Sequence, residues 1–239
     1  MKATELIDPV LPVTRSRAFT RDNSGNDVSM IDHLVFASDD LPKASALVAD
    51  LLGVTPTPGG SHIGKGTRNE LLSLGGATYL EVIGPDTAQP APDGPRPFGI
   101  DELTEPALVA WCVRPVRPLR EIVSQAREAG IEFGDVSAMS RRRPDGVLLE
   151  WELTVPQFDG PFGRALPFMI DWEDSAHPSD TLQPAVRLVR LDVFHPEPHK
   201  LGTVFDIIGL TSGVAVHEAD QPALRARIAI AQGEVTLTS

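Results

Sequence analysis

Cysteine and long apolar runs are scarce in this chain of 239 residues. Its single cysteine, Cys112, excludes an internal disulfide, and the apolar run around it, 108–113, is typical of a buried core position. No stretch approaches the roughly 20 apolar residues that a membrane-spanning helix needs. The N-terminal residues lack the apolar core of a signal peptide, because charged residues and prolines interrupt them. These absences predict a cytoplasmic protein outside the membrane.

Basic residues are also in deficit. The chain has 21 Lys and Arg against 33 Asp and Glu, which gives a formal net charge of −12. Such a charge argues against nucleic acid or an anionic membrane as a partner. The one dense basic run, 141–143, precedes a Pro-Asp-Gly turn at 144–146. We therefore expect this run to be the solvated end of a hairpin.

A strand followed by a helix that stops at a glycine occurs three times in the sequence. The helices are predicted to end at Gly53, Gly130 and Gly209, which are 77 and 79 residues apart. Glycine suits this position because it readily adopts the left-handed conformation that ends many helices. The period is too long for a solenoid repeat and fits a small βαβββ module.

These modules predict an α+β fold. Tandem βαβββ modules are expected to form an open, cupped mixed sheet, followed by a third, short βαβββ unit. The predicted parts are an extended or disordered N-terminal arm (1–29), module one (30–86), a Pro-rich extended connector (87–106), module two (107–180) and the third unit (185–239).

Two polar side chains lie in the first and last strands of module one. Because side chains alternate along a strand, His33 shares a face with Val35, and Glu81 shares a face with Tyr79 and Ile83. An imidazole and a carboxylate that face into one cup form half of a site for Fe²⁺, Mn²⁺, Zn²⁺ or Ni²⁺. Taken alone, His33 is better explained by a structural hydrogen bond and Glu81 by exposure to solvent, so the metal hypothesis depends on the pair.

The glycine-rich segment 59–69 brings further polar groups to one rim of the cup. Its glycines permit close backbone approach. Arg68 is a candidate for binding a substrate carboxylate, with Asn69 beside it, and His62 is a candidate for proton transfer. The alternative is a hairpin in which the glycines only turn the chain. Trp172 and Tyr79 are expected to wall the pocket or to pack in the core.

Glu150 and Glu152 flank Trp151 and point to one face of a predicted strand. They are either an acid and base pair or, as like charges on one strand usually are, part of a solvated face.

The sequence resembles the vicinal oxygen chelate superfamily, in its glyoxalase-like branch, over roughly residues 31–180. The matching stretches are Ile31-Asp-His-Leu-Val-Phe-Ala37, the segment 59–69, Tyr79-Leu-Glu-Val-Ile-Gly-Pro85, Pro167-Phe-Met-Ile-Asp-Trp172 and His177-Pro-Ser179. The resemblance implies paired βαβββ modules around a metal that is held by the first and last strands of each module.

Carried over to this sequence, the resemblance assigns His33 and Glu81 as metal ligands. Module two departs from the pattern, because its first strand offers no His or Gln where a ligand is expected. Its last strand offers Asp171, close to the position that matches Glu81. His62 or His177 could complete the ligand set, and Trp172 and His177 are expected to contact substrate.

Two functions follow from this resemblance. The first is a divalent-metal enzyme of lyase, isomerase, epimerase or dioxygenase type that acts on a small oxygen-rich substrate, with His62 or Asp171 moving the proton. The second is a metal-free protein that binds a small molecule, as resistance proteins of the superfamily do. The third unit and the arm could instead serve only oligomerisation, such as a homodimer.

Overall fold

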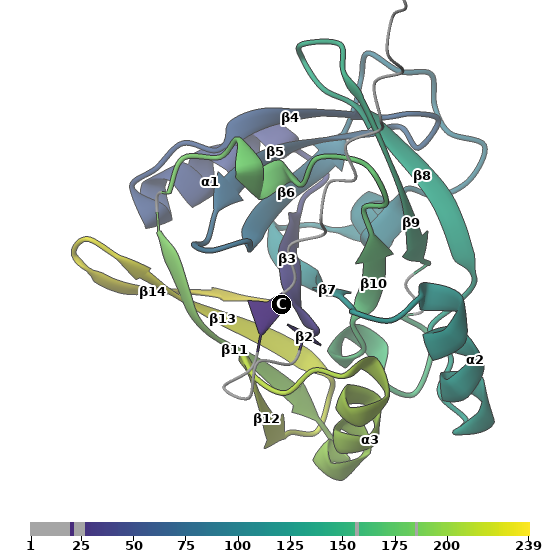
Figure 1. The fold of residues 1–239 in the computed structure, drawn as a ribbon. Helices are drawn as coiled ribbons and strands as arrows, with labels where there is room; N and C mark the ends of the chain where they lie inside the picture. Colours follow the sequence, from purple (N-terminus) through teal and green to yellow (C-terminus); the bar gives the residue numbers. More distant parts are fainter. Residues whose placement is uncertain (1–19, 22–26, 156–157, 185) are drawn as a thin grey trace, which may run out of the picture.

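The computed structural model describes residues 20–21, 27–155, 158–184 and 186–239. Most of the predicted arm lies outside these ranges; Thr20–Arg21 (β1) and Asp27–Val28 (β2) pair with each other. The first module follows at once (Figure 1). It comprises β3 (Met30–Ala37), α1 (Leu41–Leu52), β4 (Thr57–His62), β5 (Thr67–Ser73) and β6 (Tyr79–Pro85).

The second module repeats this order. It comprises β7 (Ala107–Arg114), α2 (Leu119–Glu128), β8 (Val136–Arg142), β9 (Leu148–Thr154) and β10 (Phe168–Asp171), with a short 3-10 helix, η2 (Gly163–Ala165), before β10. A further 3-10 turn, η3 (Pro178–Asp180), follows β10. The predicted α+β class with tandem βαβββ modules is thereby confirmed, while the residue limits given to each module stay predictions.

The sheets of the two modules join at both edges. The strand order is β10-β7-β3-β6-β5-β4-β8-β9, and the outer strands pair to close a barrel. At one seam β3 and β7 run antiparallel over their whole length. At the other, β4 and β8 pair only at Ser61 with Arg142 and His62 with Arg141. The expected cup is thus completed into a barrel by a very short pairing.

The cap residues of α1 explain its limits. Asp40 precedes the helix, and its side chain accepts a hydrogen bond from the backbone nitrogen of Lys43, which satisfies one of the free amides of the first turn. Gly53 ends the helix with φ of 70°, as the sequence predicts. The same left-handed geometry ends α3 at Gly209.

The third unit has the predicted element order and a different strand pairing. It comprises β11 (Arg187–His195), α3 (Pro198–Ile208), β12 (Val214–Glu218), β13 (Ala223–Ile230) and β14 (Gly233–Thr238). In module one the first strand lies parallel to the last, whereas here β11 lies parallel to β12, directly after the helix. The unit therefore forms a separate sheet of order β12-β11-β13-β14.

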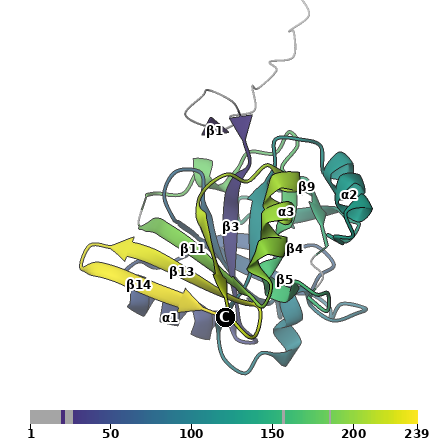
Figure 2. The ribbon, with the colours of Figure 1, turned by 90° about the horizontal axis from the view of Figure 1, so that it is seen from below.

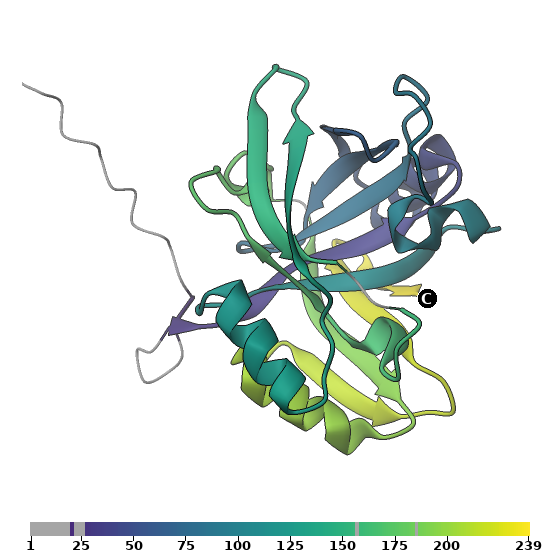
Figure 3. The same cartoon turned by 90° about the vertical axis from the view of Figure 1, so that its right-hand side faces the viewer.

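This separate sheet covers the outside of the barrel (Figure 2). Outward-facing residues such as Leu34 and Trp111 share one hydrophobic cluster with Leu191 and Leu224 of the third unit. Helices α2 and α3 lie side by side on the same flank (Figure 3). A second cluster fills the inside of the barrel. The third unit is therefore continuous with the outer core and leaves the barrel interior to module one and module two.

The connector between the modules folds against the barrel. It contains the 3-10 helix η1 (Pro97–Glu102), in which Phe98 has φ of 64°. Arg96 Nε donates to the Gly66 carbonyl at 3.0 Å, and Pro97 and Phe98 line the interior cavity. The sequence predicts an extended connector, whereas its segment Pro97–Glu102 forms a 3-10 helix that packs against the barrel.

In the described part of the chain, no helix combines the length and the apolar character that crossing a membrane requires. Cys112 is fully buried, as expected.

Candidate active site in the barrel interior

The barrel encloses a cavity of about 240 Å³. Its wall is built from inward-facing side chains of both modules and from the connector. The polar members are His33, His62, Lys65, Thr67, Asn69, Glu81 and Arg141, and the apolar and aromatic members include Tyr79, Ile83, Phe98, Trp151, Phe168, Ile170 and Trp172. A concave, largely apolar site with a few converging polar groups is typical of a small-molecule pocket.

His33 is oriented by the carboxylate of Asp32. Its Nδ1 lies 2.7 Å from Asp32 Oδ1, and both side chains are buried. Asp32 Oδ2 accepts from Trp172 Nε1 at 3.2 Å and lies 3.0 Å from His177 Nε2. Burial alone raises the pKa of Asp32, but hydrogen bonds with His177 and His33 hold that pKa far below its usual range. The ionised carboxylate thus fixes Nδ1 as the protonated nitrogen and leaves Nε2 of His33 facing the cavity.

Glu81 lies between the two histidines of the cavity. Its Oε2 is 3.7 Å from His33 Nε2, and its Oε1 is 3.5 Å from His62 Nε2. Asn69 Nδ2 donates to the same Oε1 at 2.6 Å. The carboxylate is therefore held in one place, with an imidazole nitrogen near each oxygen.

His62 is held as a neutral imidazole. Burial lowers its pKa to about 4, although the Glu81 carboxylate acts in the opposite direction. Its Nδ1 lies 3.0 Å from Thr67 Oγ1, and Asn69 Nδ2 lies 3.3 Å from its Nε2. With Asn69 donating to Nε2, Nδ1 carries the proton and donates to Thr67, and an ion bound at Nε2 would replace the hydrogen bond from Asn69.

Asn69 links Glu81 to Arg141. Arg141 Nη1 donates to Asn69 Oδ1 at 3.0 Å, and Arg141 as a residue is only 3% exposed. Gly59 makes room for this pair, because a Cβ there would lie 2.2 Å from Asn69 Oδ1 and 2.8 Å from Arg141 Nη1. The glycine in β4 is thus required by the polar pair on the neighbouring strands.

Aromatic rings enclose the polar groups. Tyr79 stacks on His33 with ring centroids 4.7 Å apart, and Trp151 packs against Trp172 at 5.1 Å. Burial raises the pKa of Tyr79 well above its usual value, so its hydroxyl stays protonated. These rings surround the polar groups with apolar surface, and such surroundings strengthen electrostatic interactions.

The donor set fits a divalent ion at His33, His62 and Glu81. Two histidines and one carboxylate form a ligand set that suits Fe²⁺ and Zn²⁺. The two separations involve different carboxylate oxygens: His62 Nε2 lies 3.5 Å from Glu81 Oε1, and His33 Nε2 lies 3.7 Å from Glu81 Oε2. The three residues do not place one ligand atom each within 4.8 Å of one another, so they would move closer together around a shared ion, whose ligand atoms lie roughly 3–4 Å apart.

A more compact group is less suited to a metal. Asp32, His33 and Cys112 place possible ligand atoms within 4.8 Å of one another. However, both oxygens of Asp32 and Nδ1 of His33 are already hydrogen-bonded. Burial also raises the pKa of the Cys112 thiol, which keeps it protonated. We therefore place no ion there.

The structure brings six of the predicted residues to the cavity wall. They are His33, His62, Asn69, Tyr79, Glu81 and Trp172. His177 lies behind this wall, where it contacts Asp32 and the ring of Tyr79. In this position it supports Asp32, and it lines the second cavity described below rather than the barrel interior.

Arg68 and Asp171 lie outside the cavity. Arg68 is exposed, because its neighbours Thr67 and Asn69 are the residues of β5 that point inward. Asp171 alternates with the inward-facing Ile170 and Trp172, and it accepts from the backbone nitrogen of Glu173. Neither residue is placed to contact a molecule in the barrel.

The register also corrects the alignment of Asp171 with Glu81. β3 (Met30–Ala37) and β7 (Ala107–Arg114) have the same length and begin 77 residues apart, so His33 corresponds to Ala110 and Val35 to Cys112. Val35 pairs with Glu81, and Cys112 pairs with Phe168. Phe168 therefore matches Glu81, and module two offers no ligand at either position.

Sequence reasoning missed Asp32, Arg141 and Trp151. Arg141 was assigned to a solvated hairpin end; the Pro-Asp-Gly turn is present, but Arg141 points into the barrel while Arg142 is exposed. The sequence did contain a signal for Trp151. Because side chains alternate along a strand, a tryptophan between two glutamates is expected to point inward while the glutamates point to solvent. Glu152 indeed pairs with Arg120 on the outside.

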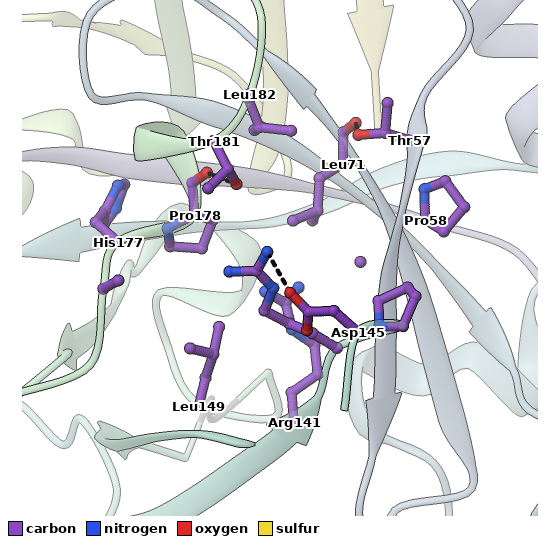
Figure 4. A pocket seen from close by; sticks show the side chains of 14 residues that line it. Thr57, Pro58, Leu71, Arg141, Asp145, Leu149, His177, Pro178, Thr181 and Leu182 are labelled. Atoms are coloured by element: carbon purple, nitrogen blue, oxygen red, sulfur yellow. Dashed lines mark hydrogen bonds and ion pairs between the residues drawn. The ribbon is translucent and has the colours of Figure 1, made fainter. Parts of the chain in front are cut away.

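A second cavity of about 300 Å³ lies between the β8–β9 hairpin, the start of β4 and the loop at η3 (Figure 4). Leu71 and Leu149 lie in its wall, and Arg143 pairs with Asp145 at its edge, 2.9 Å apart. Arg141 borders both cavities. His177 also lines this hollow.

Comparison with known proteins agrees with this architecture. A family model described as a glyoxalase-like domain matches residues 31–206, whereas no curated protein matches the sequence. A solved structure of a hypothetical protein from Staphylococcus aureus has a TM-score of 0.58 and 16% identity, covering 88% of this chain and 85% of that chain. At such identity the likeness concerns the fold alone.

Two enzymes are more distant. Methylmalonyl-CoA epimerase from Mycobacterium tuberculosis has a TM-score of 0.35 and 18% identity, over 59% of this chain and 84% of its own. A mutant of 4-hydroxymandelate synthase from Streptomyces coelicolor has a TM-score of 0.41 and 16% identity, over 88% and 62%.

Proposed function

Since this chain belongs to the glyoxalase-like domain family, we propose that it is a metal-dependent enzyme that acts on a small oxygen-bearing substrate inside the barrel. The observation that carries this proposal is the position of Glu81 between Nε2 of His33 and Nε2 of His62. These three side chains would hold a divalent ion. Such an ion, when bound, supplies Lewis-acid polarisation of a substrate oxygen.

The surrounding residues prepare this ligand set. Asp32 binds Nδ1 of His33 and so directs Nε2 to the cavity, and Asn69 holds the carboxylate of Glu81 in place. The low pKa of His62, about 4, favours a ligand role over the proton transfer expected from the sequence, because so weak a base abstracts protons poorly at neutral pH. The aromatic rings bind the apolar part of a substrate and exclude water.

Metal analysis of untagged protein tests the proposal. We expect one divalent ion per chain after reconstitution with Fe²⁺, Mn²⁺, Zn²⁺ or Ni²⁺, and its loss in His33→Ala and in Glu81→Ala. His199→Ala is the matched control, because that histidine is exposed on α3. Turnover of 2-oxo-aldehydes, catechols and acyl thioesters is then assayed. No bound metal under any reconstitution would overturn the proposal.

A second function is metal-free binding of a small molecule. One observation favours it: Ala110 and Phe168 stand where module two would supply ligands that match His33 and Glu81. In that case the polar wall serves recognition alone, and the histidine variants change ligand affinity without any bound metal.

A further inference from the structure

Two buried donors in the cavity wall have no acceptor in the described ranges. They are Nε of Arg141 and Nε1 of Trp151. Both residues line the interior cavity, and they are 3% and 5% exposed. A buried N–H group without an acceptor costs about 1–3 kcal/mol. Two such groups in one cavity indicate that a bound molecule supplies the acceptors.

We propose that Arg141 and Trp151 form an anion subsite that binds the carboxylate of a small aromatic or branched aliphatic acid. The proposal rests on the assignment of the barrel interior as the substrate site and specifies what that site accepts. The carboxylate would take hydrogen bonds from both unpartnered N–H groups, and its charge would balance the buried guanidinium.

The strand register brings the two donors together. Arg141 pairs with Leu149 on β9, and Trp151 pairs with Met139 on β8. Arg141 and Trp151 are therefore diagonal neighbours on the inner face of this hairpin, where long side chains are within reach of each other. Both belong to module two, which supplies none of the proposed metal ligands. Module one would thus bind the metal, and module two would bind the anionic group of the ligand.

Among the residues that the structure describes, Arg141 forms no ion pair, although the charge of Glu81 acts on it from a distance. Its Nη1 donates to the neutral oxygen of Asn69. Glu81 is on the other side of this amide, bound to Asn69 Nδ2. Burial lowers the pKa of Arg141, but a guanidinium in a protein remains protonated. A buried cation of this kind attracts an anionic ligand, because an unpaired charge in the interior is unfavourable.

The rest of the cavity selects the body of the ligand. Rings of Trp151, Trp172 and Phe168 with the side chain of Ile170 leave an apolar space next to the donors. A cavity of about 150 Å³ holds a benzene molecule, so about 240 Å³ accommodates a single ring with a carboxylate. The volume excludes large cofactors held entirely within the barrel.

Calorimetric titration with benzoate, benzamide and benzyl alcohol tests this subsite. We expect benzoate to bind about ten- to a hundredfold more tightly than its uncharged analogues, as the loss of charge-assisted hydrogen bonds implies. Arg141→Met should reduce benzoate affinity to the level of benzamide, and Trp151→Phe should weaken it less. Arg142→Met is the matched control, because the adjacent guanidinium is exposed, and it should leave benzoate binding unchanged.

Three results would overturn the subsite: no benzoate binding at millimolar concentration, equal affinity for benzoate and benzamide, or equal losses in the Arg141 and Arg142 variants. Arg141→Lys keeps the charge without the Nε donor and should retain part of the affinity, which separates binding from a folding defect. Titrations of metal-free protein and of His33→Ala distinguish the two proposals. If benzoate binds to metal-free protein and to His33→Ala, and the wild-type protein takes up no metal under any reconstitution, the subsite is supported and the metal enzyme is rejected.

Discussion

Nδ1 of His33 lies 2.7 Å from Oδ1 of Asp32, and both side chains are buried, that of His33 in the cavity wall and that of Asp32 behind it. The contact joins consecutive residues of β3, where a register irregularity between Ile31 and His33 interrupts the pairing with β7. Adjacent residues of a regular strand point to opposite faces. Here the carboxylate instead reaches the imidazole, and His33 is oriented by its own neighbour in the chain.

Asp32→Asn should lower metal affinity by about ten- to a hundredfold, which is typical for the loss of a carboxylate that orients a metal-binding histidine. The change removes the negative charge that fixes the tautomer of His33. Competition titration with a chromophoric chelator measures the effect. Asp192→Asn is the control, because Asp192 is equally buried but contacts His217 and Arg225 in the third sheet. Equal losses in both variants would contradict the role given to Asp32.

The low pKa of His62 predicts a loss of stability in mild acid. The unfolded chain takes up a proton near pH 6.5, whereas folded His62 does so only near pH 4. The unfolded state therefore binds more protons between these values, and the free energy of unfolding falls as the pH falls through this window. The full shift corresponds to at most roughly 3 kcal/mol.

Urea unfolding of wild type and His62→Gln at several pH values between 7 and 4 measures this contribution. We expect a shallower pH dependence in His62→Gln, and an unchanged one in His199→Gln, whose side chain is exposed. Identical slopes for the wild type and both variants would show that His62 does not carry the effect.

Periodicity predicted the scaffold better than the site. The helix ends at Gly53 and Gly209 and the inward direction of His33 and Glu81 depend on local geometry, which sequence patterns record directly. Asp171 was misplaced because the matching of β6 with β10 depends on strand register, which the number of residues between strands does not reveal. Arg141 was misplaced because a polar run next to a turn has the pattern of a solvated hairpin. Arg141 can be buried because Gly59 leaves space for its guanidinium and Asn69 accepts a hydrogen bond from it, and both residues belong to the neighbouring pair of strands, β4 and β5.

The pairing of the third unit also escaped prediction. The order of strands and helix in the sequence is the same as in module one. Tertiary packing decides whether the first strand pairs with the strand after the helix or with the last strand. The hydrophobic pattern of β11 satisfies both arrangements.

Gly60→Ala should weaken the short seam that closes the barrel. Gly60 has φ of 143°, and a Cβ there would lie 2.0 Å from the carbonyl oxygen of Arg142 on β8. The strained backbone alone costs about 1–3 kcal/mol, and the clash would separate β4 from β8. Thermal unfolding should show a lower midpoint for Gly60→Ala than for Gly94→Ala, whose Cβ meets no atom within 4 Å. Equal midpoints would contradict this seam.

Leu191→Ala should destabilise the barrel together with the third unit. Leu191 is fully buried in the cluster that also contains Leu34 and Trp111 of the barrel strands. Loss of a buried leucine typically costs about 2–5 kcal/mol. We expect one cooperative unfolding transition at lower urea concentration, and a much smaller change in Leu51→Ala, because Leu51 is 37% exposed. Two separate transitions would show that the third unit unfolds independently.

Anomalous diffraction at the absorption edge of the reconstituted metal tests the central claim most directly, because it locates the ion. The account predicts one strong peak per chain inside the barrel, within bonding distance of Nε2 of His33, Nε2 of His62 and the carboxylate of Glu81. A metal-loaded crystal with no peak among these three side chains, or with its peak beside Asp32 and Cys112, would contradict it.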